Sequence, residues 1–289
     1  MKSTMRVFAP AKINVYLRII GRRPDGYHLL DSLMVPVSLY DIIEIEAEKG
    51  APEITVTCDD PSIPCDKTNL VYKAAALLCE ETGIQAKIAI DLRKNIPAGA
   101  GLGGGSSDAA VVLKSLNILL SLGLTEAQLC TLAARLGADV PFFIPCQPAR
   151  VGGIGEVLTM VPPLPALPIV IVVPPFGVAT PWAYRRFDEF PASEPEHLSF
   201  PEFIVGQWPP PELLVNDLER AVVPEYPLIA QIKSLLCDLG AIGALMSGSG
   251  SAVFGLFRHR TAAEQAVALI KDTRKTFLVE ALSSPSLIF

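Results

Sequence analysis

The segment from residue 95 to residue 110 reads NIPAGAGLGGGSSDAA, and five of the seven residues from Gly99 to Gly105 are glycine. A glycine within the chain loses more conformational entropy on folding than any other residue, so such a run needs a compensating role. The run is bracketed by an apolar segment with strand character, residues 86–92, and by one with helical spacing, residues 109–122. A flexible linker is seldom placed so tightly between two ordered segments. We therefore expect a loop whose backbone N–H groups approach an anion closely, with the positive end of a helix dipole behind them.

The balance of charges argues against a nucleic-acid partner. The chain of 289 residues has a formal net charge of -6, and its lysines and arginines are scattered rather than clustered. A phosphate backbone would be expected to meet a basic patch or stripe. Half of the residues are hydrophobic and 19% are charged. This composition is typical of a folded protein, and the length suits one large or two modest domains.

The cysteines and apolar segments favour a cytoplasmic protein without a membrane span. The six cysteines form no C-x-x-C pair and only three histidines accompany them, so we expect free thiols in a reducing compartment. Arg6 and Lys12 interrupt any apolar core of a signal peptide. Residues 157–184 carry no charge but include seven prolines, which favours a Pro-rich connection and a buried strand over a spanning helix. The cysteines are Cys58, Cys65, Cys79, Cys130, Cys146 and Cys237.

Short strand-like and helix-like segments follow one another along the chain. A Pro-rich link at residues 162–168 divides them into two units, which we place at residues 1–160 and 161–289. The mixture lacks a regular β-α-β-α alternation, so it favours an α+β fold over a doubly wound sheet. In the first unit, alternation predicts strands at 15–20, 41–48, 53–58 and 87–92, and helical spacing predicts helices at 69–82, 106–122 and 125–136. In the second, we expect a strand at 169–173, a loop-rich region at 187–211, a helix at 227–239, strands at 241–246 and 252–257, and a helix at 262–273.

The glycine loop matches neither of the common phosphate-binding signatures. It lacks the Gly-Lys-Ser/Thr ending of a P-loop. A G-x-G-x-x-G string occurs at Gly99, Gly101 and Gly104, but no acidic partner for a ribose follows at the expected distance. Taken alone, the string is weak support for nucleotide binding.

The full order of the loop, PAGAGLGGGSSDAA, resembles the ATP loop of the GHMP kinases. Two further motifs of that superfamily follow the expected order, APAKINVYL at residues 9–17 and LMSGSGSAVFG at residues 245–255. The segments PAKIN, GRRPDGYH, AGLGGGSSDAA, LGADVPFF, NDLE and MSGSGS together resemble one family within it, the 4-diphosphocytidyl-2-C-methyl-D-erythritol kinases. The resemblance extends from residue 10 to about residue 257.

The resemblance implies a fold, a reaction and its reactants. The fold is an α+β two-domain arrangement, with an N-terminal domain like ribosomal protein S5, a C-terminal ferredoxin-like α/β sandwich and an active site in the cleft between them. The reaction is an ATP-dependent, Mg²⁺-assisted phosphorylation of the 2-hydroxyl of a cytidine diphosphate-linked methylerythritol, in the non-mevalonate isoprenoid pathway. No nucleic-acid or membrane partner is implied, and the chain is expected to act as a monomer or homodimer.

The resemblance also assigns roles in the reaction to individual residues. Lys12 is expected to lower the pKa of the substrate hydroxyl and to steady the transferred charge, although a surface lysine with a buried stem remains an alternative. Asp139 is expected to be the catalytic base, with a buried capping aspartate as its alternative. Asn69 matches a position near the adenine, and Lys94 one near the nucleotide or its phosphates. The triphosphate nest comprises Pro97, Ala98, Gly99, Ala100, Gly101, Leu102, Gly103, Gly104, Gly105, Ser106 and Ser107.

Substrate selection is expected to depend on aromatic side chains, because a cytosine ring stacks well on them. Tyr27 and His28 match the cytidine-binding positions of the family, and Tyr184 matches an aromatic residue after a Thr-Pro pair. The alternative for both tyrosines is an ordinary half-buried tyrosine. Asn14 matches a substrate-contacting position. Residues 247–251 are expected to close over the nucleotide from the second domain.

The sequence leaves alternatives open for one residue, for one segment and for the function. Asp108 is interpreted either as part of the nucleotide site or, as the favoured alternative, as an acidic residue in the first helical turn that stabilises the dipole. The segment ARVGGIGE at residues 149–156 fits the family only from Gly153, so the register of the backbone there is not determined. Other GHMP kinases are rivals that need no cytidine pocket. A non-catalytic nucleotide- or RNA-binding relative would be expected to lose Lys12 or Asp139, and both are present.

Overall fold

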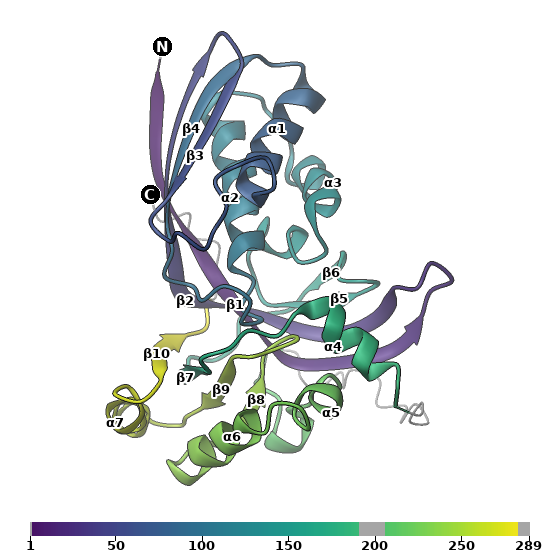
Figure 1. Cartoon of the computed structure of the whole chain (residues 1–289), viewed down its shortest axis with the longest axis vertical. Helices are drawn as coiled ribbons and strands as arrows, with labels where there is room; N and C mark the ends of the chain where they lie inside the picture. Colours follow the sequence, from purple (N-terminus) through teal and green to yellow (C-terminus); the bar gives the residue numbers. More distant parts are fainter. Residues whose placement is uncertain (1, 191–205, 283–289) are drawn as a thin grey trace.

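Two long strands, β1 (Ser3–Arg22) and β2 (His28–Lys49), form an antiparallel pair whose far end extends as an arm beyond the helices (Figure 1). The computed structural model describes residues 2–190 and 206–282. Of β1, the sequence predicts only residues 15–20. The segment before them was missed because the side chains from 9 to 17 are continuously buried and show no alternation. A strand covered on both faces loses the two-residue period that identifies strands in a sequence. Its partner β2 alternates from residue 38 to residue 47, as predicted.

The first sheet is built around β2. Its order is β3–β4–β2–β5–β6, and β1 pairs with β2 outside that path. The strand β3 runs parallel to β4, whereas β2 is antiparallel to β1, β4 and β5. The strands have the bounds β3 (Glu53–Cys58), β4 (Ala86–Arg93), β5 (Ala149–Gly152) and β6 (Val157–Met160).

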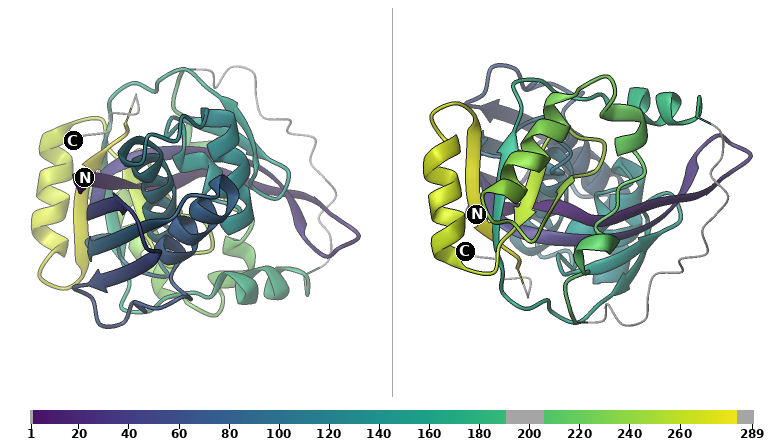
Figure 2. Two further views of the ribbon diagram at one scale, coloured as in Figure 1. Left: turned by 90° about the horizontal axis from the view of Figure 1, so that it is seen from above. Right: turned by 90° about the horizontal axis from the view of Figure 1, so that it is seen from below.

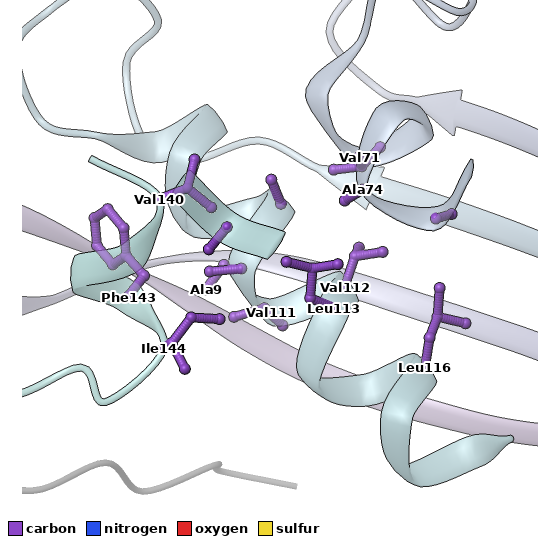
Figure 3. Packing of buried hydrophobic residues seen from close by; sticks show 14 of the residues in the cluster. Ala9, Val71, Ala74, Val111, Val112, Leu113, Leu116, Val140, Phe143 and Ile144 are labelled. Atoms are coloured by element: carbon purple, nitrogen blue, oxygen red, sulfur yellow. The ribbon is translucent and has the colours of Figure 1, made fainter. Parts of the chain in front are cut away.

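Three helices cover one face of this sheet, α1 (Leu70–Thr82), α2 (Gly104–Leu119) and α3 (Glu126–Leu136). All three were predicted, including the capping box in which Thr125 and Gln128 satisfy each other's backbone N–H groups at the start of α3. Apolar side chains of α1 and α2 pack with Ala9 of β1 and with Phe143 of the short 3₁₀ helix η1 (Pro141–Phe143) (Figure 3). This core fixes the direction of α2, whose first turn faces the cavity described below.

The second sheet has four antiparallel strands in the order β10–β7–β9–β8. One face, with Val170 and Val172, packs on α6 and α7, and the other, with Ile169 and Ile171, packs on the β1–β2 pair. Figure 2 shows these helices on the side away from α1–α3. The elements are β7 (Pro168–Val173), β8 (Gly243–Met246), β9 (Val253–Leu256), β10 (Lys275–Glu280), α6 (Leu228–Asp238) and α7 (Arg260–Ile270).

These elements confirm the α+β prediction, but several others were not expected. All five elements predicted for the second unit are present: the strands at 169–173, 241–246 and 252–257 and the helices at 227–239 and 262–273. Their bounds lie within two residues of the predicted ones, except that α7 ends at Ile270 rather than at residue 273. Part of the predicted loop-rich region, residues 191–205, lies outside the described residues. Within the described residues no helix is long and apolar enough to cross a membrane. The unexpected elements are β5, β6, β10, α4 (Thr180–Phe187), η3 (Pro211–Leu213) and α5 (Glu219–Val222).

The unusual segment ARVGGIGE forms strand β5 and the turn that follows it. Arg150 on β5 makes a bidentate ion pair with Asp31 on β2, with distances of 2.7 and 3.0 Å. The strand pairs with residues 32–34 of β2, and Gly155 in the turn lines the cavity. The register that was left open is therefore set by strand pairing and by this ion pair.

Candidate active site

A cavity of about 480 Å³ lies where the glycine loop, the middle of β1–β2 and the second sheet meet. Its wall includes residues 97–106 of the loop, Lys12 and Asn14 of β1, and Asp139. Tyr184 of α4 closes one end, and Gly248 and Ser249 come from the turn between β8 and β9. The cavity thus gathers parts of all three motifs recognised in the sequence.

Glycines in the loop are required by close approaches within the protein as well as by backbone conformation. Gly99, Gly101 and Gly103 all have φ between 65° and 76°, a region that other residues rarely adopt. A Cβ at Gly101 would lie 2.1 Å from the carbonyl oxygen of Ser247. A Cβ at Gly103 would lie 2.9 Å from the Phe143 ring. The loop can therefore follow this path only with bare backbone.

The loop ends at the N-terminus of α2, and its two serines have different surroundings. Gly103 is the N-cap and offers no side chain to cap the first turn, so the N–H groups there suit an anionic ligand. Ser106 lines the cavity, as expected. Ser107 is fully buried, and its hydroxyl has no hydrogen-bond partner within the described residues. Only the first of the two serines faces the cavity.

Backbone and side-chain hydrogen bonds fasten the loop to the second sheet. The hydroxyl of Ser247 donates to the carbonyl of Gly101 at 3.0 Å, and the N–H of Ala252 donates to the carbonyl of Ala100 at 3.0 Å. The N–H of Val178 donates to the carbonyl of Gly99 at 3.3 Å. The turn at residues 247–251 therefore packs directly on the glycine loop, while its closing over the nucleotide stays a prediction.

Lys12 is a buried cation that faces the cavity. Its side chain is 4% exposed, and its Nζ lies 2.5 Å from Oδ1 of Asn14 and 3.5 Å from Oδ2 of Asp139. The surface-lysine alternative is therefore wrong. The side chain of Asp139 is 40% exposed and lines the cavity, so the buried-cap alternative is wrong as well.

Asn14 is held in one orientation by its neighbours. Its Nδ2 donates to the hydroxyl of Ser32 at 2.9 Å, and that hydroxyl donates to the carbonyl of Tyr16 at 2.6 Å. The amide oxygen is thereby left to face the ammonium of Lys12. Ser32 was not identified from the sequence, because nothing in its segment distinguishes it from any other strand serine.

Lys94 lines the cavity next to the loop, and two carboxylates hold its ammonium there. Its Nζ is bonded to the carboxylates of Asp41 on β2 and Asp108 on α2, and all three side chains are buried. Asp41 also accepts from the N–H groups of Asn95 and Ile96, at 2.6 and 2.8 Å. Asp108 is the fifth residue of α2 and not in its first turn, so its interpretation as a dipole-stabilising cap was wrong.

The proton affinities of this buried triad are shifted by burial and by charge. Burial raises the pKa of Asp108 to about 7, with the Asp41 carboxylate adding to the rise and Lys94 opposing it. Burial lowers the pKa of Lys94, but the two carboxylates outweigh it and the net shift is upward. The triad therefore holds a charged lysine between two acids, one of which binds a proton readily.

Asn69 caps α1 beside the cavity. Its Oδ1 accepts from the N–H of Val71 at 2.9 Å and its Nδ2 donates to the carbonyl of Pro64 at 2.6 Å. Together with the side chains of Ile63, Leu70 and Leu92, it lines the part of the cavity beyond the loop. This part is apolar enough to accept the face of a flat ring.

Of the three predicted cytidine-binding residues, one lines the cavity. Tyr184 lines the cavity and stacks on His28, with 4.9 Å between ring centroids and 26° between planes. Burial raises the pKa of Tyr184, and the nearby Asp139 adds to the rise. Tyr27 is 60% exposed on the arm, so it is not the half-buried tyrosine of the alternative interpretation. The structure brings Tyr184 and His28 together and leaves Tyr27 outside their stack.

No group of three or more His, Cys, Asp or Glu side chains that could hold a metal occurs within residues 2–190 and 206–282. All six cysteines are free thiols, as predicted.

Comparisons with known proteins agree on one group. The model of the GHMP kinases N terminal domain matches residues 69–146, and that of the GHMP kinases C terminal matches residues 204–273. The 4-diphosphocytidyl-2-C-methyl-D-erythritol kinase of Pelobacter propionicus is 45% identical over 268 residues, which cover 93% of this chain and 94% of that protein. The protein of the same name from Syntrophotalea carbinolica is 48% identical over 249 residues, covering 86% and 88%.

Solved structures give the same result. A crystal structure of 4-(cytidine 5'-diphospho)-2C-methyl-D-erythritol kinase superposes with a TM-score of 0.79 at 36% identity, covering 96% of this chain and 99% of the other. A homoserine kinase from Cytophaga hutchinsonii superposes with a TM-score of 0.71 at 22% identity, covering 98% and 96%. At that identity the second match supports the fold alone.

Proposed function

Because the chain belongs to the family of 4-diphosphocytidyl-2-C-methyl-D-erythritol kinases within the GHMP kinases, we infer that it transfers the γ-phosphoryl group of ATP to the 2-hydroxyl of 4-diphosphocytidyl-2-C-methyl-D-erythritol. This reaction serves the non-mevalonate route to isoprenoid precursors. The observation that carries the proposal is the approach of Lys12 to Asp139, 3.5 Å apart, in the same cavity as the glycine loop. We place the reacting hydroxyl beside this pair and the triphosphate against the loop.

The glycine loop is proposed to bind the triphosphate. The N–H groups of the first turn of α2 and the positive end of its dipole favour anionic oxygens. The adenine would occupy the apolar part of the cavity beside Asn69. We assign to Lys94 an indirect role toward the phosphates, since its ammonium lines the cavity but is already bonded to Asp41 and Asp108.

Lys12 and Asp139 are proposed to act on the substrate hydroxyl. A buried ammonium lowers the pKa of a hydroxyl placed beside it and stabilises negative charge that develops during phosphoryl transfer. Asp139 accepts the hydroxyl proton or orients the hydroxyl for attack. Asn14 would hold the ammonium in place through its amide oxygen.

The donor set of the cavity fits Mg²⁺, the usual companion of ATP. This ion prefers oxygen ligands and commonly keeps several waters while binding one or two protein groups and the phosphates. The hydroxyl of Ser106 and the carboxylate of Asp139 both line the cavity and are the oxygens we propose for it. When bound, the ion would neutralise charge on the β- and γ-phosphates.

The cytidine group is proposed to bind where Tyr184 and His28 meet. Tyr184 would stack on the base, Tyr27 would approach from the arm, and His28 would hydrogen-bond to the edge of the ring. Six free thiols are consistent with a cytosolic enzyme.

One assay tests the proposed function. The purified protein is given ATP, Mg²⁺ and a panel of alcohols: the cytidine diphosphate-linked methylerythritol, the same alcohol without the cytidine group, homoserine and mevalonate. We expect ATP consumption with the cytidine-linked alcohol alone. Turnover of homoserine or mevalonate at a comparable rate would instead indicate one of the other GHMP activities.

A further inference from the structure

The aspartate that ends α4 contacts His28 across the opening of the cavity. Nε2 of His28 lies 2.6 Å from Oδ1 of Asp188, and the imidazole is 9% exposed. The other carboxylate oxygen of Asp188 lies 3.3 Å from Arg22, on the strand that pairs with His28. Asp188 therefore joins α4 to both strands of the arm.

The imidazole is enclosed by side chains from the last turn of α4 and the residue that follows it. Tyr184 stacks on it, and Phe187 meets it edge-on, with 6.3 Å between centroids and 86° between planes. Tyr184 at the same time lines the cavity, as does Leu30 two residues along β2 from His28. The two ring contacts thus fix the plane of the imidazole, and the bond to Asp188 fixes its rotation within that plane, at the edge of the proposed cytidine site.

The contact with Asp188 decides which ring nitrogen carries a proton. An ionised carboxylate accepts hydrogen bonds and cannot donate them, so Nε2 must bear the hydrogen of this short bond. In the neutral imidazole the other nitrogen, Nδ1, then has a lone pair and acts as an acceptor. A carboxylate that fixes a histidine tautomer in this way governs what the ring can recognise.

We propose that Asp188 is the positioning residue for His28 and, through the tautomer that it imposes, determines which pyrimidine the site accepts. This inference rests on the proposed function, since it assigns His28 to the base of the substrate. Cytosine presents a donor, its N4 amino group, where uracil presents an acceptor, O4. A fixed Nδ1 acceptor matches the amino group and faces the uracil oxygen with an unpaired lone pair. Sites that pair with polar groups reject such a mismatch strongly.

The test compares cytidine- and uridine-diphosphate forms of the substrate. The variants are Asp188→Asn, which keeps the shape but no longer fixes the proton, and Asp188→Ala. The control is Glu189→Gln, because Glu189 is the adjacent carboxylate and pairs with Arg186 rather than His28. A second control, Arg22→Ala, removes the partner on the other oxygen of Asp188 and leaves the bond to His28 in place.

We expect both Asp188 variants to lower the ratio of kcat/KM for the cytidine form over the uridine form by about tenfold or more, mainly through KM. The KM for ATP should stay within about twofold of the wild type in the Asp188 variants. In both control variants, the ratio of kcat/KM for the cytidine form over the uridine form should stay within about twofold of the wild type. If the wild type discriminates and both Asp188 variants keep its ratio, the inference is overturned. If the wild type does not use the cytidine form at all, the proposed function fails instead.

A spectroscopic readout tests the tautomer independently of any substrate. The chain has three histidines, so ¹⁵N NMR of the imidazoles, with His28→Gln used for assignment, resolves the signals of His28. The wild type should show one neutral tautomer with the proton on Nε2, and Asp188→Asn should show a mixture. A mixture in the wild type would overturn the inference even if the kinetic ratios changed.

Discussion

At the buried end of the proposed site Lys12 and Asn14 line the cavity and are almost completely buried, whereas at the proposed base-binding end Tyr27 is 60% exposed and does not line the cavity. The buried end is made of β1, β2 and the glycine loop, and its polar groups are bonded to one another through Ser32 and Ser247. The exposed end is made by a short helix and the arm. The comparison suggests that the machinery for phosphoryl transfer is preorganised by the core, while recognition of the base depends on a few contacts that can change without disturbing it.

The largest effect should come from breaking the buried end. We predict that Lys12→Ala and Asp139→Asn each lower kcat by about 10²–10⁴-fold, since each removes a group that acts on the reacting hydroxyl. Binding of ATP, measured by calorimetry, should be largely intact. Matched controls are Lys87→Ala and Asp91→Asn, whose side chains are exposed on β4. A loss below tenfold in both active-site variants would remove the catalytic assignment.

The next effect concerns the buried ion pairs of Lys94 with Asp41 and Asp108, next to the glycine loop. Replacing Lys94 by Met should lower the free energy of unfolding by about 3–5 kcal/mol, because it strands the carboxylates of Asp41 and Asp108 without their cation. Adding Asp108→Asn to this variant should recover part of the loss. Urea unfolding at pH 7 measures both. A loss under about 1 kcal/mol would mean that the triad is far more solvated than its burial indicates.

The same triad predicts a dependence of stability on pH. The folded-state pKa of Asp108 is about 7, above the ordinary value of about 3.9, so the folded chain keeps a proton that the unfolded chain releases. The stability contributed by Asp108 is therefore full below about pH 4 and is lost as the pH rises towards 7. Unfolding free energies measured between pH 5 and pH 8 should fall more in the wild type than in Asp108→Asn. Parallel curves would contradict the assignment.

A smaller effect is expected from crowding the loop itself. Gly103→Val would force a branched side chain into positive φ and against Phe143, which typically costs about 1–3 kcal/mol and should displace the N–H groups that bind phosphate. Gly50→Ala is the control, because its Cβ would meet no atom within 4 Å and Gly50 does not line the cavity. Calorimetric titration with ATP should show weaker binding for the first variant alone. An affinity within about threefold of wild type, or 0.65 kcal/mol, would place the phosphates elsewhere.

The smallest effects should appear at the exposed end. Removing the ring of Tyr184 should cost about 1–3 kcal/mol of stacking, seen as a raised KM for the cytidine substrate with the KM for ATP unchanged. Tyr27→Ala should cost less, since its ring is largely in solvent. Steady-state kinetics with both substrates varied decides this. A raised KM for ATP in either variant would show that the two ends of the cavity are not separate.

Much of the fold and the core of the site could be predicted because the signals are local. The glycine run, the helix that follows it and the capping box at Thr125 are each legible within a few residues. Lys12 was identifiable because it interrupts an apolar strand. The strand itself was missed over residues 9–14, since continuous burial there removes the alternation.

The contacts that sequence reasoning missed join distant segments. Asp41 lies 53 residues from Lys94, and Asp188 lies 160 residues from His28. Asp41 begins the alternating segment 41–48 and Asp188 lies in the segment predicted to be loop-rich, but no property of either segment indicates the partner of its aspartate. Only the folded chain brings these pairs together, which is why the two carboxylates that hold Lys94 at the cavity were not expected.

The apolar layer shared by the second sheet and the β1–β2 pair has a consequence for how the enzyme could be engineered. Ile169 and Ile171 pack in one cluster with Ala11, Ile13 and Val35, so neither half of the chain has a closed core of its own on that side. A chimaera that exchanged residues 161–289 for those of a distant relative would have to match the side chains of this layer as well as the site. Recombination between relatives at the Pro-rich link should therefore fail unless both sides of this layer come from the same parent, although the link looks like the natural place to cut.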